Sequence, residues 1–127
     1  MTEKFKYEFD TKLGILFKRY HGEITLKDIT SSWDNAIKND KIPQKTIGFI
    51  LDYRKASFKL VNNEILGIPQ YYRNNLPIFN GKRIAIITEN PKDIIVPYLV
   101  KEEDFNYSSS PFSTIKAAIN WILEGQK

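Results

Sequence analysis

The sequence predicts an α/β domain with a mixed β-sheet, and three observations support this prediction. Near the N-terminus aromatic residues alternate with charged ones, which is the period of a strand with one buried face. Two short and almost continuously apolar runs, within residues 46–53 and 83–88, are typical of strands covered on both faces. Segments with helical spacing of apolar residues lie between and after these runs, and such alternation indicates an α/β fold.

The first two predicted strands form an antiparallel hairpin. Phe5, Tyr7 and Phe9 alternate with charged residues, a polar turn occupies residues 10–12, and a second strand covers residues 13–21. Three turn residues are too few for a crossover connection, so the two strands are expected to be antiparallel. The second strand presents two faces, one carrying Ile15, Phe17 and Arg19 and the other carrying Leu16, Lys18 and Tyr20.

A strand–helix–strand unit is expected to include that second strand. Thr25, with Asp28 three residues later, has the form of a capping box, which predicts that a helix begins there. The helix ends before Pro43 and the strand over residues 46–53 follows, so residues 13–53 are expected to form a right-handed crossover. The buried stripe expected for this helix consists of Leu26, Ile29, Trp33, Ala36 and Ile37.

The middle of the chain carries weaker signals. Asn62 or Asn63 is expected to cap a second helix, and Pro69 should kink or split that helix because proline lacks the backbone N–H. The apolar strand over residues 83–88 follows. The buried stripe expected for the second helix consists of Ile65, Leu66, Ile68, Tyr72 and Leu76.

A third helix is predicted to begin at Asn90-Pro91, because asparagine caps well and proline suits the first helical position. Residues 108–111 are expected to be a loop that leads to a last short strand at Phe112. The buried residues expected for the third helix are Ile94, Ile95, Tyr98 and Leu99.

The C-terminal helix has the clearest pattern. Ser113 or Thr114 is expected to cap it and Gly125 to end it. The predicted order is therefore β-β-α-β-α-β-α-(β)-α, with four to five strands and about four helices in a single domain over residues 1–127. The buried face of the C-terminal helix is expected to carry Ile115, Ala118, Ile119 and Ile122.

Composition and charge exclude several classes of protein. Cysteine is absent, which excludes disulfides and thiolate metal sites, and no apolar stretch approaches the ~20 residues of a membrane span. The net charge of +4 is spread, with Lys18-Arg19 and Arg54-Lys55 as the longest basic clusters, so we expect solvated surface charge rather than a nucleic-acid-binding arm. The first residues, MTEKFKYEF, lack a long apolar core, so we expect no signal peptide and a cytoplasmic location.

The polar stretch after the strand of residues 46–53 is where function should be sought first, because ligands meet open α/β sheets at the carboxyl ends of strands. We expect Asp52 and Arg54, in the loop after this strand, and Thr88 and Asn90, in the loop after the next, to bind a ligand or partner. Ser57 is the only hydroxyl residue close behind Asp52 and is a candidate phosphosite. For Asp52 itself, capping of a turn is the favoured interpretation, and action as a base or as a ligand-binding group is the alternative.

No catalytic, metal or cofactor site is expected. The only histidine, His21, lies at a strand end and is interpreted as a surface residue, and no phosphate-binding glycine motif occurs. Trp33 and Trp121 are expected to be core anchors, but Trp121 lies off the centre of its stripe, which leaves contact with a partner or ligand as an alternative. Core and rim packing is also the favoured interpretation of five residues that would otherwise form a stacking platform for single-stranded nucleic acid: Tyr53, Arg54, Tyr71, Tyr72 and Arg73.

Together these patterns resemble one known family over nearly the whole chain. The hairpin, the strand end FILDYR, the strand RIAIIT with Asn90-Pro91 after it, and an ending of the form F-(x)2-I-x-x-A-x-x-W-I are similar to the SpoIIAA-like proteins. These are the STAS-type domains related to anti-sigma-factor antagonists, and the likeness is to their small bacterial branch. The residues of the ending are Phe112, Ile115, Ala118, Trp121 and Ile122.

This resemblance implies a sheet of four to five strands with four helices, and a non-enzymatic role in regulation or ligand binding. In the antagonists, the strand equivalent to residues 46–53 leads into an Asp-Ser-Ser/Thr-Gly-type turn whose serine is phosphorylated. Asp52 matches the aspartate of that turn, whereas Tyr53 and Arg54 stand where the hydroxyl residues would be, and Ser57 lies five positions after Asp52. The same broad fold also serves lipid-binding domains.

The leading prediction is a non-catalytic, cytoplasmic regulatory or ligand-binding domain that acts through the carboxyl ends of the central strands. The expected partner is a protein or a small ligand of anionic or lipid-like chemistry; a homodimer is also open, and nucleic acid is disfavoured. One alternative is a small enzyme that uses Asp52 as acid or base and Arg54 to hold an anion, which would give Asp52 a raised pKa. The other is a nucleic-acid-binding module, whose affinity would fall steeply with salt.

Overall fold

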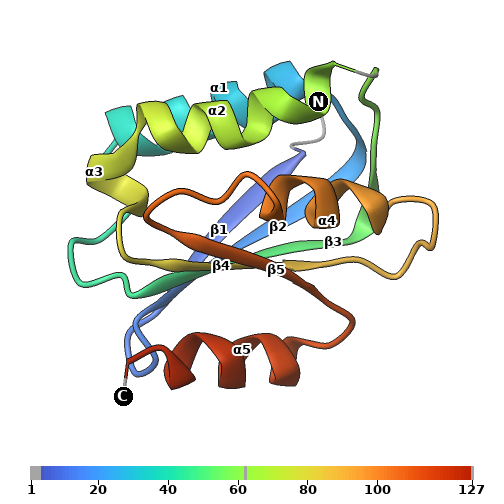
Figure 1. Ribbon diagram of the computed structural model, residues 1–127. Helices are drawn as coiled ribbons and strands as arrows, with labels where there is room; N and C mark the ends of the chain where they lie inside the picture. The colour runs from blue at the N-terminus through green and yellow to red at the C-terminus, as the bar shows by residue number, and fades with distance from the viewer. Residues whose placement is uncertain (1–3, 62, 127) are drawn as a thin grey trace.

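The computed structural model describes residues 4–61 and 63–126, arranged as a β-sheet with helices on both faces (Figure 1). The sheet has five strands in the order β1-β2-β3-β4-β5. β1 is antiparallel to β2 and the other neighbours are parallel, which confirms the predicted mixed sheet and N-terminal hairpin. The strands are β1 (Phe5–Asp10), β2 (Ile15–Ile24), β3 (Gly48–Phe58), β4 (Arg83–Ile87) and β5 (Ser108–Phe112).

The helices cover the two faces of the sheet unequally. Helices α1 to α4 lie on one face and α5 alone lies on the other, where it contacts mainly β3, β4 and β5 (Figure 1). On the α5 side, therefore, Lys6 and Glu8 of β1 and Arg19 of β2 are exposed. None of the helices within the described ranges has the length and apolarity of a membrane span. The helices are α1 (Leu26–Lys38), α2 (Gly67–Asn74), α3 (Leu76–Phe79), α4 (Ile95–Lys101) and α5 (Ile115–Glu124), with a 3-10 turn, η1 (Glu64–Leu66), before α2.

Two hydrophobic cores hold the layers together. On the side of α1 the core is aromatic, and Trp33 packs edge-on against Phe49 and Phe79 with ring centroids 5.5 and 5.3 Å apart. On the side of α5 the core is aliphatic, and Ile122 lies directly on Gly48, where a Cβ atom would be 2.6 Å from Ile122 Cγ2. Trp33 is therefore the core anchor that the sequence predicted.

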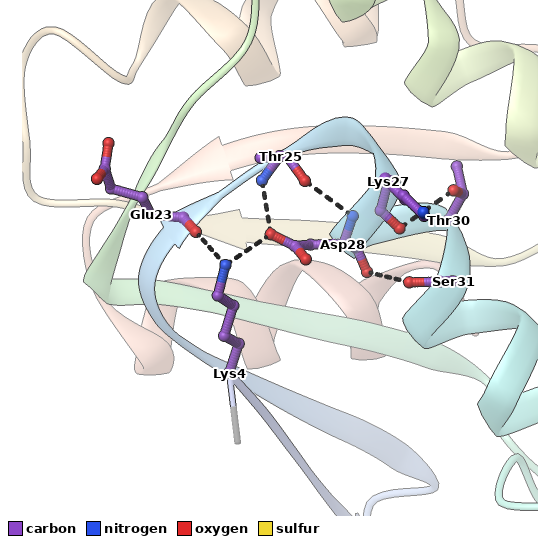
Figure 2. Close-up of polar contacts among 7 residues, drawn as sticks. All are labelled: Lys4, Glu23, Thr25, Lys27, Asp28, Thr30 and Ser31. Carbon is purple, nitrogen blue, oxygen red and sulfur yellow. Dashed lines mark hydrogen bonds and ion pairs between the residues drawn. The ribbon is translucent and has the colours of Figure 1, made fainter. Parts of the chain in front are cut away.

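The start of α1 confirms the predicted capping box and ties it to the N-terminal strand (Figure 2). Thr25 Oγ1 accepts the backbone N–H of Asp28 at 3.1 Å, and Asp28 Oδ2 accepts the backbone N–H of Thr25 at 3.0 Å. Lys4 Nζ lies between the Asp28 carboxylate and the Glu23 carbonyl oxygen, 3.0 Å from each. These bonds join the chain just before β1 to the end of β2 and to the start of α1.

The end of β3 differs from the prediction. The strand does not stop at residue 53 but continues to Phe58, and its residues 55–58 pair with residues 21–24 of β2. A register shift beside Arg19 and His21 adds a residue to β3, and after it Ala56 and Phe58 face the aromatic core. The polar residues after Asp52 therefore lie on a strand, and the prediction of a loop there was wrong because β2 supplies backbone partners for them.

Pro69 splits the second predicted helix, as expected. The turn η1 comes first and α2 then begins at Gly67, so that Pro69 lies in the first helical turn, where a missing N–H is tolerated. Asn63 makes no capping hydrogen bond, and Asn62 lies outside the described residues. Ile68 and Tyr72 of the predicted stripe are buried, whereas Leu66 is exposed because it belongs to η1.

Helix α4 begins at Ile95 rather than at Asn90-Pro91. Asn90 Oδ1 instead accepts the N–H of Lys92 at 3.1 Å in a local turn, and the later start places Pro97 in the first helical turn, where proline is tolerated. The predicted stripe was wrong for this reason: α4 buries Val96, Pro97 and Val100 and exposes Ile95, Tyr98 and Leu99, with Ile94 half-buried.

Residues 108–111 form part of β5 and are not the loop expected from the sequence. They pair with β4, and Pro111 is accommodated because β5 is an edge strand. The predicted start of α5 is confirmed by Thr114, whose Oγ1 accepts the N–H of Ala117 at 3.2 Å. Trp121 is half-buried, its ring 5.3 Å from the Phe112 ring and 4.9 Å from the Arg83 guanidinium.

Lys18 is fully buried, although its charge was expected to lie at the surface. Its Nζ donates to Ser32 Oγ, whose own proton goes to the Ile29 carbonyl oxygen at 2.8 Å. Desolvation lowers the pKa of Lys18 well below its ordinary value. The alternation along β2 had placed Lys18 on the face with Leu16 and Tyr20, and that face is the one that α1 covers. Nζ lies 4.1 to 5.5 Å from the ring centroids of Phe5, Tyr7, Tyr20 and Trp33.

Replacing Lys18 by methionine should stabilise the protein by about 1–3 kcal/mol near neutral pH, because it removes a buried amine whose charged form the core disfavours. The unfolded chain keeps a proton on Lys18 up to about pH 10.4, whereas the native chain releases it at lower pH, so native stability rises with pH in between. The advantage of Lys18→Met should therefore shrink as the pH rises from the lowered native pKa of Lys18 toward the pKa of about 10.4 of the unfolded chain. Urea unfolding across this range measures the effect, with the exposed Lys38→Met as control, and an advantage independent of pH would contradict the lowered pKa.

Candidate functional site

The carboxyl ends of β2, β3 and β4 meet at one end of the sheet. Arg19 of β2, Asp52 of β3 and Ile87 of β4 are neighbours across the three strands, and Ile87 is the last residue of β4. The chain after β4 leaves the sheet there, while β2 and β3 continue together. Asp52 is therefore the last residue of β3 that has a strand on either side, at the kind of position where ligands of open α/β sheets bind.

Asp52 and Arg54 form a closed pair at this position. Asp52 Oδ1 accepts the backbone N–H of Arg54 at 3.0 Å and its Nε–H at 2.9 Å, and Asp52 Oδ2 accepts Nη2–H at 2.7 Å. The Asp52 side chain is 9% exposed and the Arg54 side chain 37%. Burial opposes ionisation of Asp52, but the hydrogen bonds and charge of Arg54, and the charge of Arg19, outweigh it and lower the pKa of Asp52. The same pairing raises the pKa of Arg54.

The pair makes Asp52 a cap for the backbone. The N–H that it accepts belongs to Arg54, two residues beyond the last pair of β3 with β4. The enzyme alternative needed a raised pKa for Asp52, and the pKa is lowered instead. A carboxylate held by three hydrogen bonds from one arginine residue does not favour proton transfer as its role.

A groove of about 790 Å³ opens beside this pair, over the part of the sheet that α5 leaves uncovered. We call it the basic groove. His21, Phe5 and Tyr20 also line it. Its charged lining consists of the cations Lys4, Lys6, Arg19, Arg54 and Lys55 and the carboxylates Asp52 and Glu89.

Some of these cations are neutralised within the molecule. Arg19 pairs with Glu8 at 2.7 Å, and Lys4 pairs with Asp28 at 3.0 Å (Figure 2). Lys6 and Lys55 are exposed and make no ion pair within the described part of the chain. The five cations of the groove are set against four carboxylates, the lining residues Asp52 and Glu89 and the ion-pair partners Glu8 and Asp28, so the basic groove keeps an excess of one positive charge.

A second hollow, of about 440 Å³, adjoins the basic groove at the end of β3, and we call it the edge hollow. It brings together three of the predicted site residues, Arg54, Ser57 and Asn90. Arg54, Lys55 and Glu89 line both hollows. The remaining lining of the edge hollow is Gly22, Glu23 and Ala56.

Thr88 and Ser57 lie apart from the basic groove. Thr88 is 4% exposed and lines neither hollow; its N–H donates to the Phe112 carbonyl oxygen at 3.3 Å, and its hydroxyl has no hydrogen-bond partner among the described residues. Ser57 pairs with Glu23 in the ladder between β2 and β3, so it lies within a strand and not at a helix start. Its role as a phosphosite stays a prediction.

Sequence reasoning did not identify the part of the basic groove that comes from β1 and β2. That part consists of Lys4, Lys6, Arg19 and His21. The missing information is the strand order, which places Lys6 opposite Arg19 and Arg19 opposite Asp52. One signal was available, because the alternation along β2 places Arg19 on the face opposite Lys18.

The five residues considered as a stacking platform do not share one surface. Tyr53 and Tyr72 are buried in the aromatic core, which confirms core packing for them. Tyr71 OH donates to Asp34 at 2.7 Å on the other side of the sheet from the basic groove, and Arg73 pairs with Glu103 at 3.3 Å. In residues 4–61 and 63–126, no three histidine, aspartate or glutamate side chains are grouped so as to hold a metal ion.

Asp52→Asn should destabilise the protein by about 1–3 kcal/mol at neutral pH, since it weakens charge-assisted hydrogen bonds from Arg54. Because the native pKa of Asp52 is lowered, its contribution is present above about pH 4 and is lost as the pH falls through the native pKa. The stability difference between wild type and Asp52→Asn should therefore shrink below about pH 4. Urea unfolding at acidic and neutral pH measures this, with the exposed Glu102→Gln as control. A variant as stable as wild type at neutral pH would show that the pair does not support the fold.

Comparison with known proteins identifies the fold. No protein-family model matches the chain, and no curated protein sequence matches it. Among solved structures, it is similar to an uncharacterised protein of the DUF3478 family with a SpoIIAA-like fold from Shewanella loihica PV-4, with a TM-score of 0.59 and 15% identity over 96% of this chain and 98% of that one. A second match is the anti-sigma factor antagonist SpoIIAA in its unphosphorylated form, with a TM-score of 0.48 and 17% identity over 94% of this chain and 97% of that one. A third is the Bacillus cell fate determinant SpoIIAA in the phosphorylated form, with a TM-score of 0.49 and 15% identity over 93% of this chain and 98% of that one. The chain has the SpoIIAA-like fold, as its motifs predicted.

Proposed function

We propose that this chain is a non-catalytic regulatory domain that binds an anionic group of a partner or ligand, a carboxylate or a phosphate, in the basic groove. The observation that carries the proposal is the unbalanced positive charge on an uncovered part of the sheet at the carboxyl ends of β2 and β3. The SpoIIAA-like fold is compatible with this role and does not specify the ligand.

The cations of the groove are suited to hold an anion from two sides. Lys6 on β1 and Lys55 on β3 are exposed and bring their ammonium groups without an internal partner in the described ranges. Arg54 commits Nε and Nη2 to Asp52, which fixes its guanidinium plane and leaves Nη1 to donate to a ligand. An arginine held in place by Asp52, together with two exposed lysines that line the same groove, favours binding of an acidic group without a covalent step.

Two features support a role without catalysis. Asp52, a carboxylate that lines the groove, already accepts hydrogen bonds from Arg54 and has a lowered pKa. His21 lines the groove but makes no side-chain hydrogen bond with a carboxylate of the described residues, so it lacks the orienting partner of a general base.

Phosphorylation of Ser57 would act on the same region. Ser57 lies in the edge hollow together with Arg54 and Lys55, which are the cationic partners that a phosphate on a strand requires. A phosphoserine there would compete with an external anion for these two side chains, and would thereby regulate the basic groove.

Reversing two charges tests the proposal. The double variant Lys6→Glu with Lys55→Glu should weaken binding of a hexaglutamate peptide by about tenfold or more, because two attractive cations become repulsive. The control is Lys38→Glu with Lys116→Glu, which changes net charge equally at exposed sites on α1 and α5. NMR titration at low salt follows the amide signals that line the groove. Inorganic phosphate as a second titrant distinguishes recognition of phosphate from recognition of carboxylate.

Equal weakening in the control pair would indicate a general charge effect and no groove. Absence of any shift at the groove with either titrant would refute the proposal. A single-stranded oligonucleotide that binds far more tightly than hexaglutamate, with a steep salt dependence, would instead support the nucleic-acid alternative.

A further inference from the structure

β3 extends well beyond the end of β4 and there has a strand on one side only. β4 ends at Ile87, opposite Asp52, whereas β3 continues to Phe58. Along this stretch β3 pairs with residues 21–24 of β2, whose pairing with β1 ends at Tyr20, followed by the bond from the His21 N–H to the Lys4 carbonyl oxygen at 2.9 Å. Among the residues that the structure describes, the result is a two-stranded parallel ribbon. Such a ribbon is unusual, because parallel sheets are normally extended on both sides and covered on both faces.

The free edge of the ribbon carries backbone groups that β4 does not reach. Lys59 donates its N–H to the Ile24 carbonyl oxygen of β2 at 2.8 Å. Since successive residues of a parallel strand turn their backbone groups to opposite sides, those of Ala56 and Phe58 point away from β2. Before these two residues, Arg54 donates its backbone N–H to Asp52 Oδ1. On the side of Ala56 and Phe58 that faces away from β2, no strand of the described part of the chain pairs with them.

Space lies beside this edge. The edge hollow separates residues 54–57 of β3 from Glu89 and Asn90, which follow β4 after it has left the sheet. The hollow, of about 440 Å³, extends from Gly22 and Glu23 of β2 across β3 to Glu89 and Asn90, so it lies over the ribbon and reaches its free edge. A strand added at that edge would lie about 4.8 Å from β3. Unpaired edges of this kind are templates for a strand from another chain.

We propose that the free edge of β3 at Ala56 and Phe58 takes an extended acidic segment of a partner protein as an added β-strand. This inference rests on the proposed function, because it identifies the partner of the basic groove as a protein segment. Carbonyl oxygens of the added strand would accept hydrogen bonds from the backbone N–H groups of Ala56 and Phe58, and its acidic side chains would form ion pairs with the cations of the groove.

The side chains along the edge define the pattern of the segment. On the open face of the ribbon lie Lys55, which is exposed, and Ser57, so side chains of the partner on that face should be acidic or hydroxylic. On the covered face lie Ala56 and Phe58, and Phe58 shares a small apolar cavity with Val96 of α4. A segment in which apolar and acidic residues alternate fits both faces.

A second copy of this chain fits the edge less well. Antiparallel pairing of two copies through Ala56 and Phe58 would bring Lys55 of one copy opposite Lys59 of the other. Like charges directly opposite one another destabilise a strand pair. Charge therefore favours an acidic partner over self-association.

The test uses the whole protein and a capped heptapeptide of alternating valine and glutamate at low salt. Binding should slow hydrogen exchange of the Ala56 and Phe58 amides by about tenfold or more. A peptide N-methylated on the edge that faces β3 should give no protection, and a valine–lysine peptide should bind at least about tenfold more weakly. Ala56→Pro removes the first free N–H and should abolish protection of Phe58, and Ala56→Val, which keeps the N–H, is the matched control.

Several results would overturn the inference. They are equal binding of the N-methylated or the valine–lysine peptide, protection at the outer edge of β1 or β5 instead, or no protection at all. Concentration-dependent protection without peptide would show that a second copy occupies the edge. The N-methylated peptide tests the added strand on the wild-type protein, so the inference can be refuted even if Ala56→Pro fails to fold.

The outcome also separates this inference from the proposed function. If hexaglutamate shifts the groove signals but the valine–glutamate peptide leaves Ala56 and Phe58 unprotected, the added strand is wrong and the anion site stands. If the peptide protects the edge while hexaglutamate and phosphate leave the groove unchanged, the anion site is wrong.

Discussion

The pairing of β2 with β3 is the interaction on which the rest of the structure depends. It is the longest ladder of the sheet, and it joins the antiparallel hairpin to the parallel strands. Its two faces carry the two cores, with Leu16 and Phe49 on the aromatic side and Ile15 and Ile50 on the aliphatic side. Because this ladder runs past the end of β4, its inner part is covered by helices and its outer part forms the exposed ribbon. The inner part of this pair of strands thus supports the core, and the outer part carries the proposed binding edge.

Two adjacent cations on β2 show how the alternation of a strand separates packing from recognition. Lys18 turns toward α1 and is enclosed by aromatic rings, whereas Arg19 turns to the uncovered face and lines the basic groove. The π faces and the hydroxyl of Ser32 offset part of the desolvation of Lys18, and its lowered pKa reports the part that remains. The basic cluster in the sequence is therefore no measure of surface charge, since only one of its members meets solvent.

Local sequence signals predicted the elements that are complete within a few residues. Thr25 and Asp28 cap α1 because a capping box needs no distant partner. The residues after Asp52 are polar and read locally as a loop, but β2 supplies their backbone partners, as β4 does for residues 108–111. For the same reason, the sequence predicted only part of the candidate site. Asp52 and Arg54 were predicted because they follow a buried strand, whereas Lys6 lines the same groove only because of the order and register of two further strands.

Asp52 connects the end of the β3–β4 pairing to the candidate site, because it accepts both the backbone N–H and the guanidinium of Arg54. Just beyond the last pair of β3 with β4, the Asp52 carboxylate accepts the backbone N–H of Arg54. The same carboxylate holds the Arg54 guanidinium, so that a side chain common to both hollows is fixed by a feature of the strand edge. Because the backbone N–H of Arg54 is already bound, a strand added to β3 would begin its pairing at Ala56. The position of Asp52 would therefore set the register of the proposed added strand, and a one-residue slip would exchange the faces of that strand and place its acidic side chains over Phe58.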